Sequence, residues 1–203
     1  MGRQSQWTEA RRFTPPRGAL RTVVGAGLLL AIGGGSCVAS AASGSPHLTR
    51  PGTTLKLGQP AIVEFDTITP KGKSGPSYKL QVTIASITAG SISDFKGISL
   101  TGVPKGDSPT YVRVKMTNIS GKSFPTKSLD PANAVEAVVG NQLASSLIIA
   151  GYFPRCPDAD TPSPFKAGQT FTTCETYMEK GKATKVAYDG SSATLNSPII
   201  WSR

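Results

Sequence analysis

Two segments of alternating polarity constrain the fold of this chain more than any other feature. In residues 78–84, Tyr, Leu, Val and Ile alternate with Lys, Gln and Thr. Residues 111–116 repeat the pattern, and Val112, Val114 and Met116 are expected to point inward. Because successive side chains of a β-strand lie on opposite faces, both segments predict strands with one buried face and one solvated face.

Shorter apolar runs predict further strands, at 61–65 and, with weaker patterns, at 135–139, 143–150, 170–178, 182–188 and 193–201. Turn sequences rich in Gly, Pro and Asn separate them. Only Asp130–Ala134 resembles a helix start, with Asp as cap and Pro at the first helical position, and it predicts a single turn. Seven or eight short strands in about 150 residues indicate an all-β antiparallel β-sandwich, with most aromatic side chains in its core.

Residues 1–42 have the organisation of an export signal, with a basic segment, an apolar segment at 22–32 and small residues after it. Two processing routes fit this segment. Gly35-Ser36-Cys37 resembles a lipobox, in which Cys37 is acylated, although Gly34 stands where leucine is usual. Cleavage after Ala39-Ser40-Ala41 would instead release a soluble protein, and an uncleaved anchor over 22–42 is a third alternative. All three predict an extracytoplasmic location, either membrane-anchored or secreted.

The cysteines agree with export. The chain contains three, Cys37, Cys156 and Cys174, so acylation or removal of Cys37 leaves an even pair. We expect a Cys156–Cys174 disulfide, because oxidising compartments favour such bridges; two free buried thiols are the alternative. Residues 43–52 have linker composition, which places the folded domain at 53–203.

The C-terminal half is similar to a known family. It carries Cys156-Pro157-Asp158 and the Pro-rich stretch to Gly168, then Cys174-Glu175-Thr176-Tyr177, and a glycine, basic strand and tyrosine between Gly181 and Tyr188. This combination resembles small actinobacterial secreted proteins and lipoproteins with an immunoglobulin-like domain. The resemblance implies an immunoglobulin-like β-sandwich over 53–203. Members are mostly uncharacterised, some are known as secreted antigens, and the family supplies no catalytic residues.

The charge of the chain argues against nucleic acid as a partner. The net charge is +10, but after the leader 17 basic residues face 11 acidic ones, a net charge of +6. The lysines are scattered singly and are not interleaved with aromatic residues, as a nucleic-acid site would require. The surface is compatible with anionic lipid or wall polymer.

Catalytic and metal sites are also poorly supported. The single histidine, His47, lies in the expected linker, where it cannot activate a serine or cysteine nucleophile, and no CxxC pair exists. The closest carboxylates, Asp158 and Asp160, offer too few oxygens for a strong calcium site. We therefore expect no enzyme, metal or cofactor.

The sequence favours a non-enzymatic cell-envelope or secreted domain that binds an envelope or extracellular protein or ligand, with membrane contact through the lipid if Cys37 is acylated. The expected binding surface is the loop over 154–173, with Asp158, Asp160, Phe165 and Lys166 as candidate contacts. Two alternatives stay open. An envelope hydrolase would bring a Ser–Lys pair or two carboxylates together in a pocket. A small-ligand carrier would hold an apolar cavity between its sheets.

Overall fold

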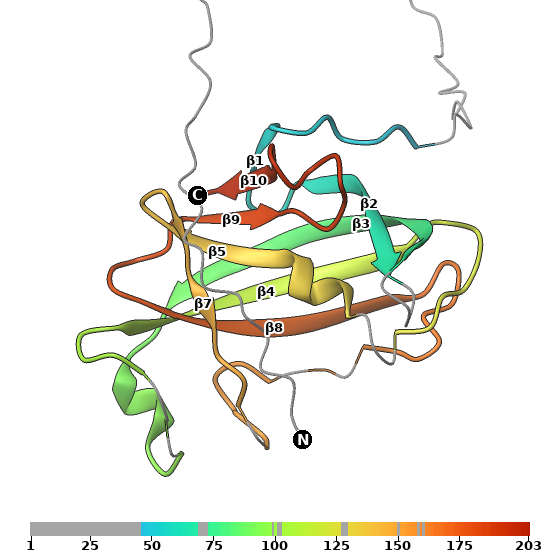
Figure 1. Ribbon diagram of the computed structural model, residues 1–203. Coiled ribbons are helices and arrows are strands. Elements are labelled where there is room, and N and C mark those ends of the chain that lie inside the picture. The colour runs from blue at the N-terminus through green and yellow to red at the C-terminus, as the bar shows by residue number, and fades with distance from the viewer. Residues whose placement is uncertain are drawn as a thin grey trace, which may run out of the picture.

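Two β-sheets facing each other form the body of the molecule (Figure 1). The computed structural model describes residues 46–68, 73–98, 100, 103–126, 130–149, 151–157, 159 and 161–203. No helix among them has the length and apolar character needed to cross a membrane. The predicted leader, including Cys37, lies outside the described residues.

Sheet A contains, in spatial order, β1 (Thr54–Lys56), β10 (Ile199–Ser202), β9 (Lys185–Tyr188), β5 (Val135–Val139) and β6 (Gln142–Leu143). Sheet B contains β2 (Pro60–Ile68), β3 (Ser74–Ala89), β4 (Ser108–Asn118), β8 (Thr170–Glu179) and β7 (Ser145–Ser146). Two short 3-10 helices, η1 (Ile92–Phe95) and η2 (Pro131–Ala134), lie between strands. The β1–β10 pair is parallel, whereas the other strand pairs described here are antiparallel.

This architecture confirms the predicted all-β, immunoglobulin-like antiparallel sandwich. The two alternating segments are the central strands β3 and β4, and Val112, Val114 and Met116 are fully buried as expected. Residues 135–139 form β5 as predicted, and 170–178 fall within β8. Three other predicted strands were too long. Within 143–149, the described part of the first, only Leu143 and β7 are strand; 182–188 is strand only from 185 on, and 193–201 only from 199 on.

The single predicted helical turn is η2, and it begins as its sequence suggests. The Asp130 side chain accepts a hydrogen bond from the Ala132 amide (2.9 Å), and Pro131 occupies the first position, where a backbone donor would have no helical partner. The turn stops at Val135, where the chain enters β5. At this end the Val135 amide donates to the Ala132 carbonyl, while the Val135 backbone is already extended.

The residues before β1 contact the sandwich. The Thr49 amide donates to the Ile62 carbonyl of β2 (2.8 Å), and the Gly52 amide donates to the Ser197 carbonyl (2.8 Å). Both residues belong to the segment with linker composition, so its last part is attached to the sheets. The position of the domain boundary stays a prediction.

Two buried tyrosines cross the core and join the sheets. Tyr177 of β8 donates its hydroxyl hydrogen to the Val135 carbonyl of β5, and Tyr188 of β9 donates to the Glu64 carbonyl of β2 (2.8 Å). Burial raises the pKa of both phenols well above the ordinary value, and nearby carboxylates add to the shift. Both hydroxyls are therefore neutral donors at any physiological pH. Each hydrogen bond satisfies a hydroxyl group whose burial would otherwise be costly in free energy.

Asn118, at the end of β4, organises the loops at that edge. Its side-chain NH₂ donates to the carbonyls of Lys122 and Phe165 (2.9 Å each), and its oxygen accepts from the Ser120 amide (3.0 Å). The residue is completely buried, so these three hydrogen bonds replace water that cannot reach it. One amide thus links the 119–122 turn to Phe165, which lies 47 residues further along the chain.

Replacing this amide by a carboxyl should destabilise the domain. Asn118→Asp removes both N–H donors and leaves a buried carboxyl beside two carbonyl oxygens, so we expect a loss of about 3 kcal/mol in free energy of unfolding. Urea titration measures this loss. Asn133→Asp, the same change at an exposed position, is the control and should cost less than about 0.5 kcal/mol. Equal losses in the two variants would contradict this account of Asn118.

Candidate functional site

A disulfide attaches a small outer lobe to sheet B. Cys156 and Cys174 are bonded as predicted, with their Cα atoms 5.2 Å apart. Cys174 lies on β8 directly opposite Arg113 of β4, on the face of sheet B that points away from the core. The bridge therefore ties the loop before Cys156 to the outside of the sandwich.

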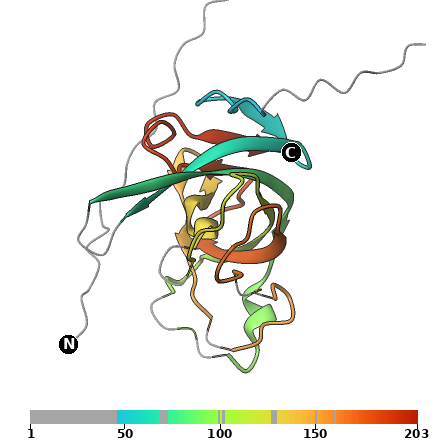
Figure 2. The same cartoon turned by 90° about the vertical axis from the view of Figure 1, so that its right-hand side faces the viewer.

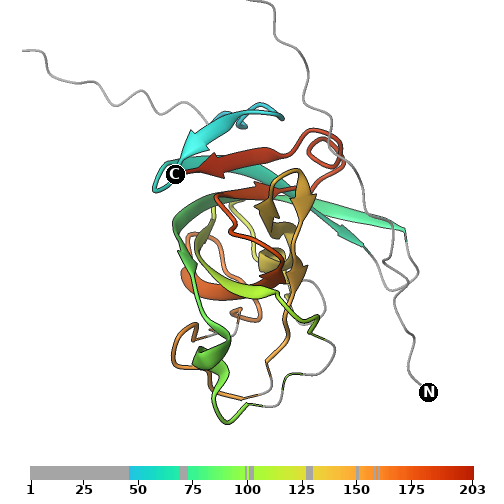
Figure 3. The same ribbon diagram turned by 90° about the vertical axis from the view of Figure 1, so that its left-hand side faces the viewer.

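We call η1 together with the described residues of 147–157 the disulfide lobe. Figures 2 and 3 show these two segments side by side at the end of the molecule away from β1 and β10. The rings of Phe95 and Phe153 stack at 4.8 Å between centroids, and Phe153 meets Tyr111 of β4 edge-on at 5.7 Å. With the disulfide and Met178, these rings form a second buried cluster, separate from the main core. The lobe is thus a packed unit rather than a free loop.

A capping box folds the first residues of the lobe. The Ser91 side chain accepts from the Ser93 amide (3.3 Å), and the Asp94 carboxylate accepts from the Ser91 amide (2.8 Å). This reciprocal pair starts the single turn of η1 and fixes the direction of the Asp94 side chain. Phe95 follows and is buried in the lobe.

Asp94 is the centre of a polar network on this lobe. The Tyr111 hydroxyl donates to Asp94 Oδ2 (2.9 Å), and the Arg155 Nε lies 3.4 Å from Oδ1. The Ser91 amide, followed by the Tyr111 hydroxyl and Arg155, holds the pKa of Asp94 below its ordinary value against the opposing effect of burial. Burial and the bond to Asp94 raise the pKa of Tyr111 well above its ordinary value. The carboxylate is therefore charged and the phenol neutral over the physiological range.

Gly90 allows the Tyr111 ring to lie where it does. A Cβ atom at this position would be 2.6 Å from both the Tyr111 hydroxyl oxygen and the ring carbon that carries it. The Gly90 amide also donates to the Pro109 carbonyl (2.8 Å), so the backbone cannot withdraw without losing that bond. Only glycine permits this close approach between β3, the ring and η1.

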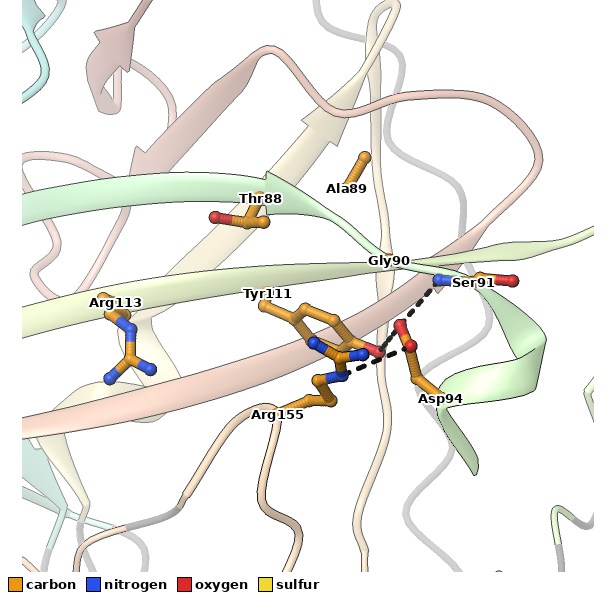
Figure 4. Close-up of a pocket in the computed structure, with 8 residues that line it drawn as sticks. All are labelled: Thr88, Ala89, Gly90, Ser91, Asp94, Tyr111, Arg113 and Arg155. Carbon is orange, nitrogen blue, oxygen red and sulfur yellow. Dashed lines mark hydrogen bonds and ion pairs between the residues drawn. The ribbon is translucent and has the colours of Figure 1, made fainter. Parts of the chain in front are cut away.

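The network borders an open pocket of about 440 Å³, shown in Figure 4. Its lining consists of Thr88, Ala89, Gly90, Ser91, Asp94, Tyr111, Arg113 and Arg155. Arg113 stands apart from the Asp94 cluster, further along β4 (Figure 4), and its guanidinium has no hydrogen bond or ion pair with any described residue. Arg155 contacts Asp94 through Nε, and its side chain is 68% exposed. The pocket lining contains two guanidinium groups and one carboxylate, so the pocket has a surplus of positive charge.

The predicted binding residues have different outcomes. Asp158 and Asp160 lie outside the described residues. The prediction that Phe165 is a surface contact was wrong. Its side chain is completely buried, and its ring packs edge-on against the rings of Phe124 (5.5 Å between centroids) and Phe171 (5.1 Å). Burial of an aromatic ring of this size is more favourable in free energy than its exposure to solvent. The hydrogen bond from Asn118 to the Phe165 carbonyl holds the backbone in the position that buries the ring. Lys166 is exposed, and its role in binding stays a prediction.

Sequence reasoning missed Asp94, Tyr111 and Arg113 as a group. A local signal existed, since Ser91-Ile-Ser-Asp94 has the spacing of a capping box. Nothing in the sequence relates that turn to β4 or to the loop of Arg155, because the strand register and the disulfide create the contact. Among the described residues, no three of His, Cys, Asp and Glu gather in a way that would hold a metal ion.

One carboxyl on the other sheet has unusual acidity. Glu136 of β5 is partly buried, and its Oε2 has no hydrogen-bond partner among the described residues. Burial, and then the negative charge of Asp189, raises the pKa of Glu136 to about 7. This is the pair that most resembles the two-carboxylate alternative, but neither residue lines the pocket described above.

Comparison with known proteins identifies no family. No family model matches the chain, and no curated protein matches it. Among solved structures, MPT63, a secreted protein of Mycobacterium tuberculosis, is 17% identical, with a TM-score of 0.47 over 78% of this chain and all of MPT63. The ycdA protein of Bacillus subtilis, a candidate lipoprotein, is 10% identical, with a TM-score of 0.41 over 70% of this chain and 38% of its own. Likenesses this distant add nothing to the functional argument.

The acidity of Glu136 predicts a pH-dependent stability. Its folded pKa of about 7 lies above the ordinary 4.5, so the folded state holds the extra proton between these values. The free energy of unfolding should therefore fall as pH rises from about 5 to about 8, by an amount on the order of 1 kcal/mol after allowance for solvent screening. Glu136→Gln should remove that part of the fall. Thermal unfolding at several pH values tests this, and parallel pH profiles for the two proteins would contradict it.

Removing the disulfide should loosen the lobe before the sandwich. The bridge joins cysteines that are 18 positions apart in the sequence, so Cys156→Ser/Cys174→Ser should lower the free energy of unfolding by about 3 kcal/mol. Hydrogen exchange should speed up mainly at η1 and in the 147–157 segment, while the amides of β5 and β9 stay protected. Reduced wild-type protein should behave as the double variant does. Uniform loss of protection in both sheets would show that the lobe is not a separate unit.

Proposed function

We propose that this protein is an exported, non-enzymatic binding domain whose pocket at the disulfide lobe recognises an anionic, hydroxylated small molecule. The export part is supported by the basic and apolar leader and by the Cys156–Cys174 bridge, which suits an oxidising compartment. Acylation at Cys37 would add a membrane contact, and cleavage after Ala41 would release the domain.

The unpartnered guanidinium of Arg113, which lines the same pocket as Arg155, is the observation that carries the binding proposal. A guanidinium presents its N–H donors as a planar fork, which matches the two oxygens of a carboxylate or the oxygens of a phosphate. Arg155 is held by one contact to Asp94, and its terminal nitrogens are left for a ligand.

The remaining groups of the pocket suit hydroxyls. Thr88 and Ser91 are exposed on its rim. The Thr88 hydroxyl can donate one hydrogen bond and accept others, and the Ser91 hydroxyl, whose oxygen accepts from Ser93, can donate one. Asp94 keeps acceptor capacity for a ligand hydroxyl beyond its three partners. A volume of about 440 Å³ falls within the range of small-molecule sites. A sugar acid or a sugar phosphate combines the required charge and hydroxyls.

The acidities in the pocket support binding rather than catalysis. Asp94 has a lowered pKa and is a poor base, whereas Tyr111 has a raised pKa and is a poor acid. General acid–base catalysis works best with groups that titrate near the operating pH. The pocket also lies at the outer lobe, not between the sheets where an apolar carrier would hold its ligand.

Calorimetry and NMR titration with three matched sugars test the proposal. Galacturonate and galactose 6-phosphate supply a charge on the same ring, and galactose supplies the ring without one. We expect the charged sugars to bind and to shift the amide signals of η1 and β4, and galactose to do neither. Arg113→Gln should weaken binding of the charged sugars about tenfold, because one charged hydrogen bond contributes on the order of 1.5 kcal/mol.

Arg50→Gln is the matched control, since it removes an exposed arginine that does not line the pocket. It should leave the affinity within about twofold of wild type. Equal effects of Arg113→Gln and Arg50→Gln would indicate general charge attraction and overturn the pocket assignment. If neither galacturonate nor galactose 6-phosphate binds, the pocket assignment is overturned for this class of ligand.

A further inference from the structure

The outer face of sheet B continues the chemistry of the pocket. Register aligns Ser86 with Arg113 and Cys174, and the next row aligns Thr83 with Lys115 and Thr172. Their chain neighbours Val112 and Val114 are fully buried, so these rows point away from the core. Tyr111 of the pocket lies on the same face, two residues before Arg113, and the pocket therefore opens onto these rows.

The rows contain cations, hydroxyls and an amide, and no carboxylate. A third row aligns Gln81 with Thr117 and Thr170, again without an acidic group. Arg113, Lys115 and Thr172 are exposed, and the Lys115 ammonium, like the Arg113 guanidinium, has no hydrogen bond or ion pair with a described residue. Apart from Asp94 in the pocket, the nearest acidic residue on this face is Glu64 of strand β2, which lies opposite Lys79. Positive charge on this face is thus not neutralised by its own strands.

The spacing of these charges suits an extended polymer. Residues two apart on a strand are separated by about 7 Å, so Arg113 and Lys115 form a line along β4 that begins at the pocket. Hydroxyl and amide side chains flank the line on β3 and β8 and can bond sugar hydroxyls. Single-stranded nucleic acid is less suited, because its bases stack on exposed aromatic rings, and Tyr111, the aromatic side chain in line with these rows, is only 5% exposed.

We propose that this cationic sheet face (Gln81, Thr83, Ser86, Arg113, Lys115 and Thr172) binds an acidic glycan that lies along β4, with one charged sugar in the pocket. The inference rests on the proposed function of the pocket and extends it from a single sugar to a polymer. Lys115 does not line the pocket. It is therefore a contact that a polymer makes and a single sugar does not.

Polygalacturonate and its monomer, galacturonate, separate the two proposals. Wild-type protein should bind the polymer at least tenfold more tightly than the monomer at low salt, and should not bind dextran, a neutral polymer. Lys115→Gln should weaken polymer binding about three- to tenfold and lower its salt dependence by about one charge, because one ion contact is lost. Monomer affinity should stay unchanged in this variant.

Lys185→Gln is the control, since it removes an exposed lysine from the central part of sheet A, and it should leave both affinities unchanged. Equal weakening of polymer binding by Lys115→Gln and Lys185→Gln would overturn the face assignment in favour of non-specific attraction. Duplex DNA bound as tightly as polygalacturonate would overturn the choice of a glycan.

The remaining outcomes distinguish the face from the pocket. If the protein binds the monomer, and Lys115→Gln binds the polymer as tightly as wild-type protein does, the extended face is overturned and the pocket assignment is kept. If wild-type protein binds the polymer but not the monomer, and Lys115→Gln weakens polymer binding, the pocket assignment is overturned and the face alone is supported. Failure of wild-type protein to bind either probe would overturn both.

Discussion

Two tyrosine hydroxyls that cross the core in opposite directions hold the sheets of this domain together. Tyr177 reaches from sheet B to the backbone of sheet A, and Tyr188 reaches from sheet A to the backbone of sheet B. Apolar packing is non-directional and would tolerate sliding of one layer over the other, whereas these bonds specify the register between layers. The position of β8 depends on this register, and β8 carries Cys174 on its other face.

The pocket depends on that placement of β8 through a short chain of contacts. Cys174 holds Cys156, and with it the segment that presents Arg155 and Phe153. Phe153 then packs on Phe95 and Tyr111, which places η1 and its Asp94 against β4. Polar groups of the site are thus supported by a small apolar cluster, separate from the main core. Sites built in this way are rigid without placing their polar groups in the interior.

The sequence allowed the strands to be predicted better than the site. Strict alternation identified β3 and β4 because a half-buried strand requires it, and cysteine parity identified the bridge. Phe165 was misassigned because a loop of Pro and Gly gives no sign that its ring is part of the core. Strand β1 was missed because three residues are too few for a pattern, and its partner β10 is distant in sequence. The contact between Asp94, Tyr111 and Arg155 depends on tertiary packing, which no local pattern encodes.

The parallel pairing of β1 with β10 has a consequence for the timing of folding. Thr54 aligns with Ile200, so one edge of sheet A closes only when segments from opposite ends of the domain have met. Contacts of such long sequence separation slow folding, because the chain loses conformational entropy before the strand pairing contributes favourable free energy. A polypeptide that must pass through a translocation channel in an extended state benefits from this delay. If the chain is exported as proposed, the same β1–β10 ladder that completes the sheet would help to keep a newly made chain competent for transport.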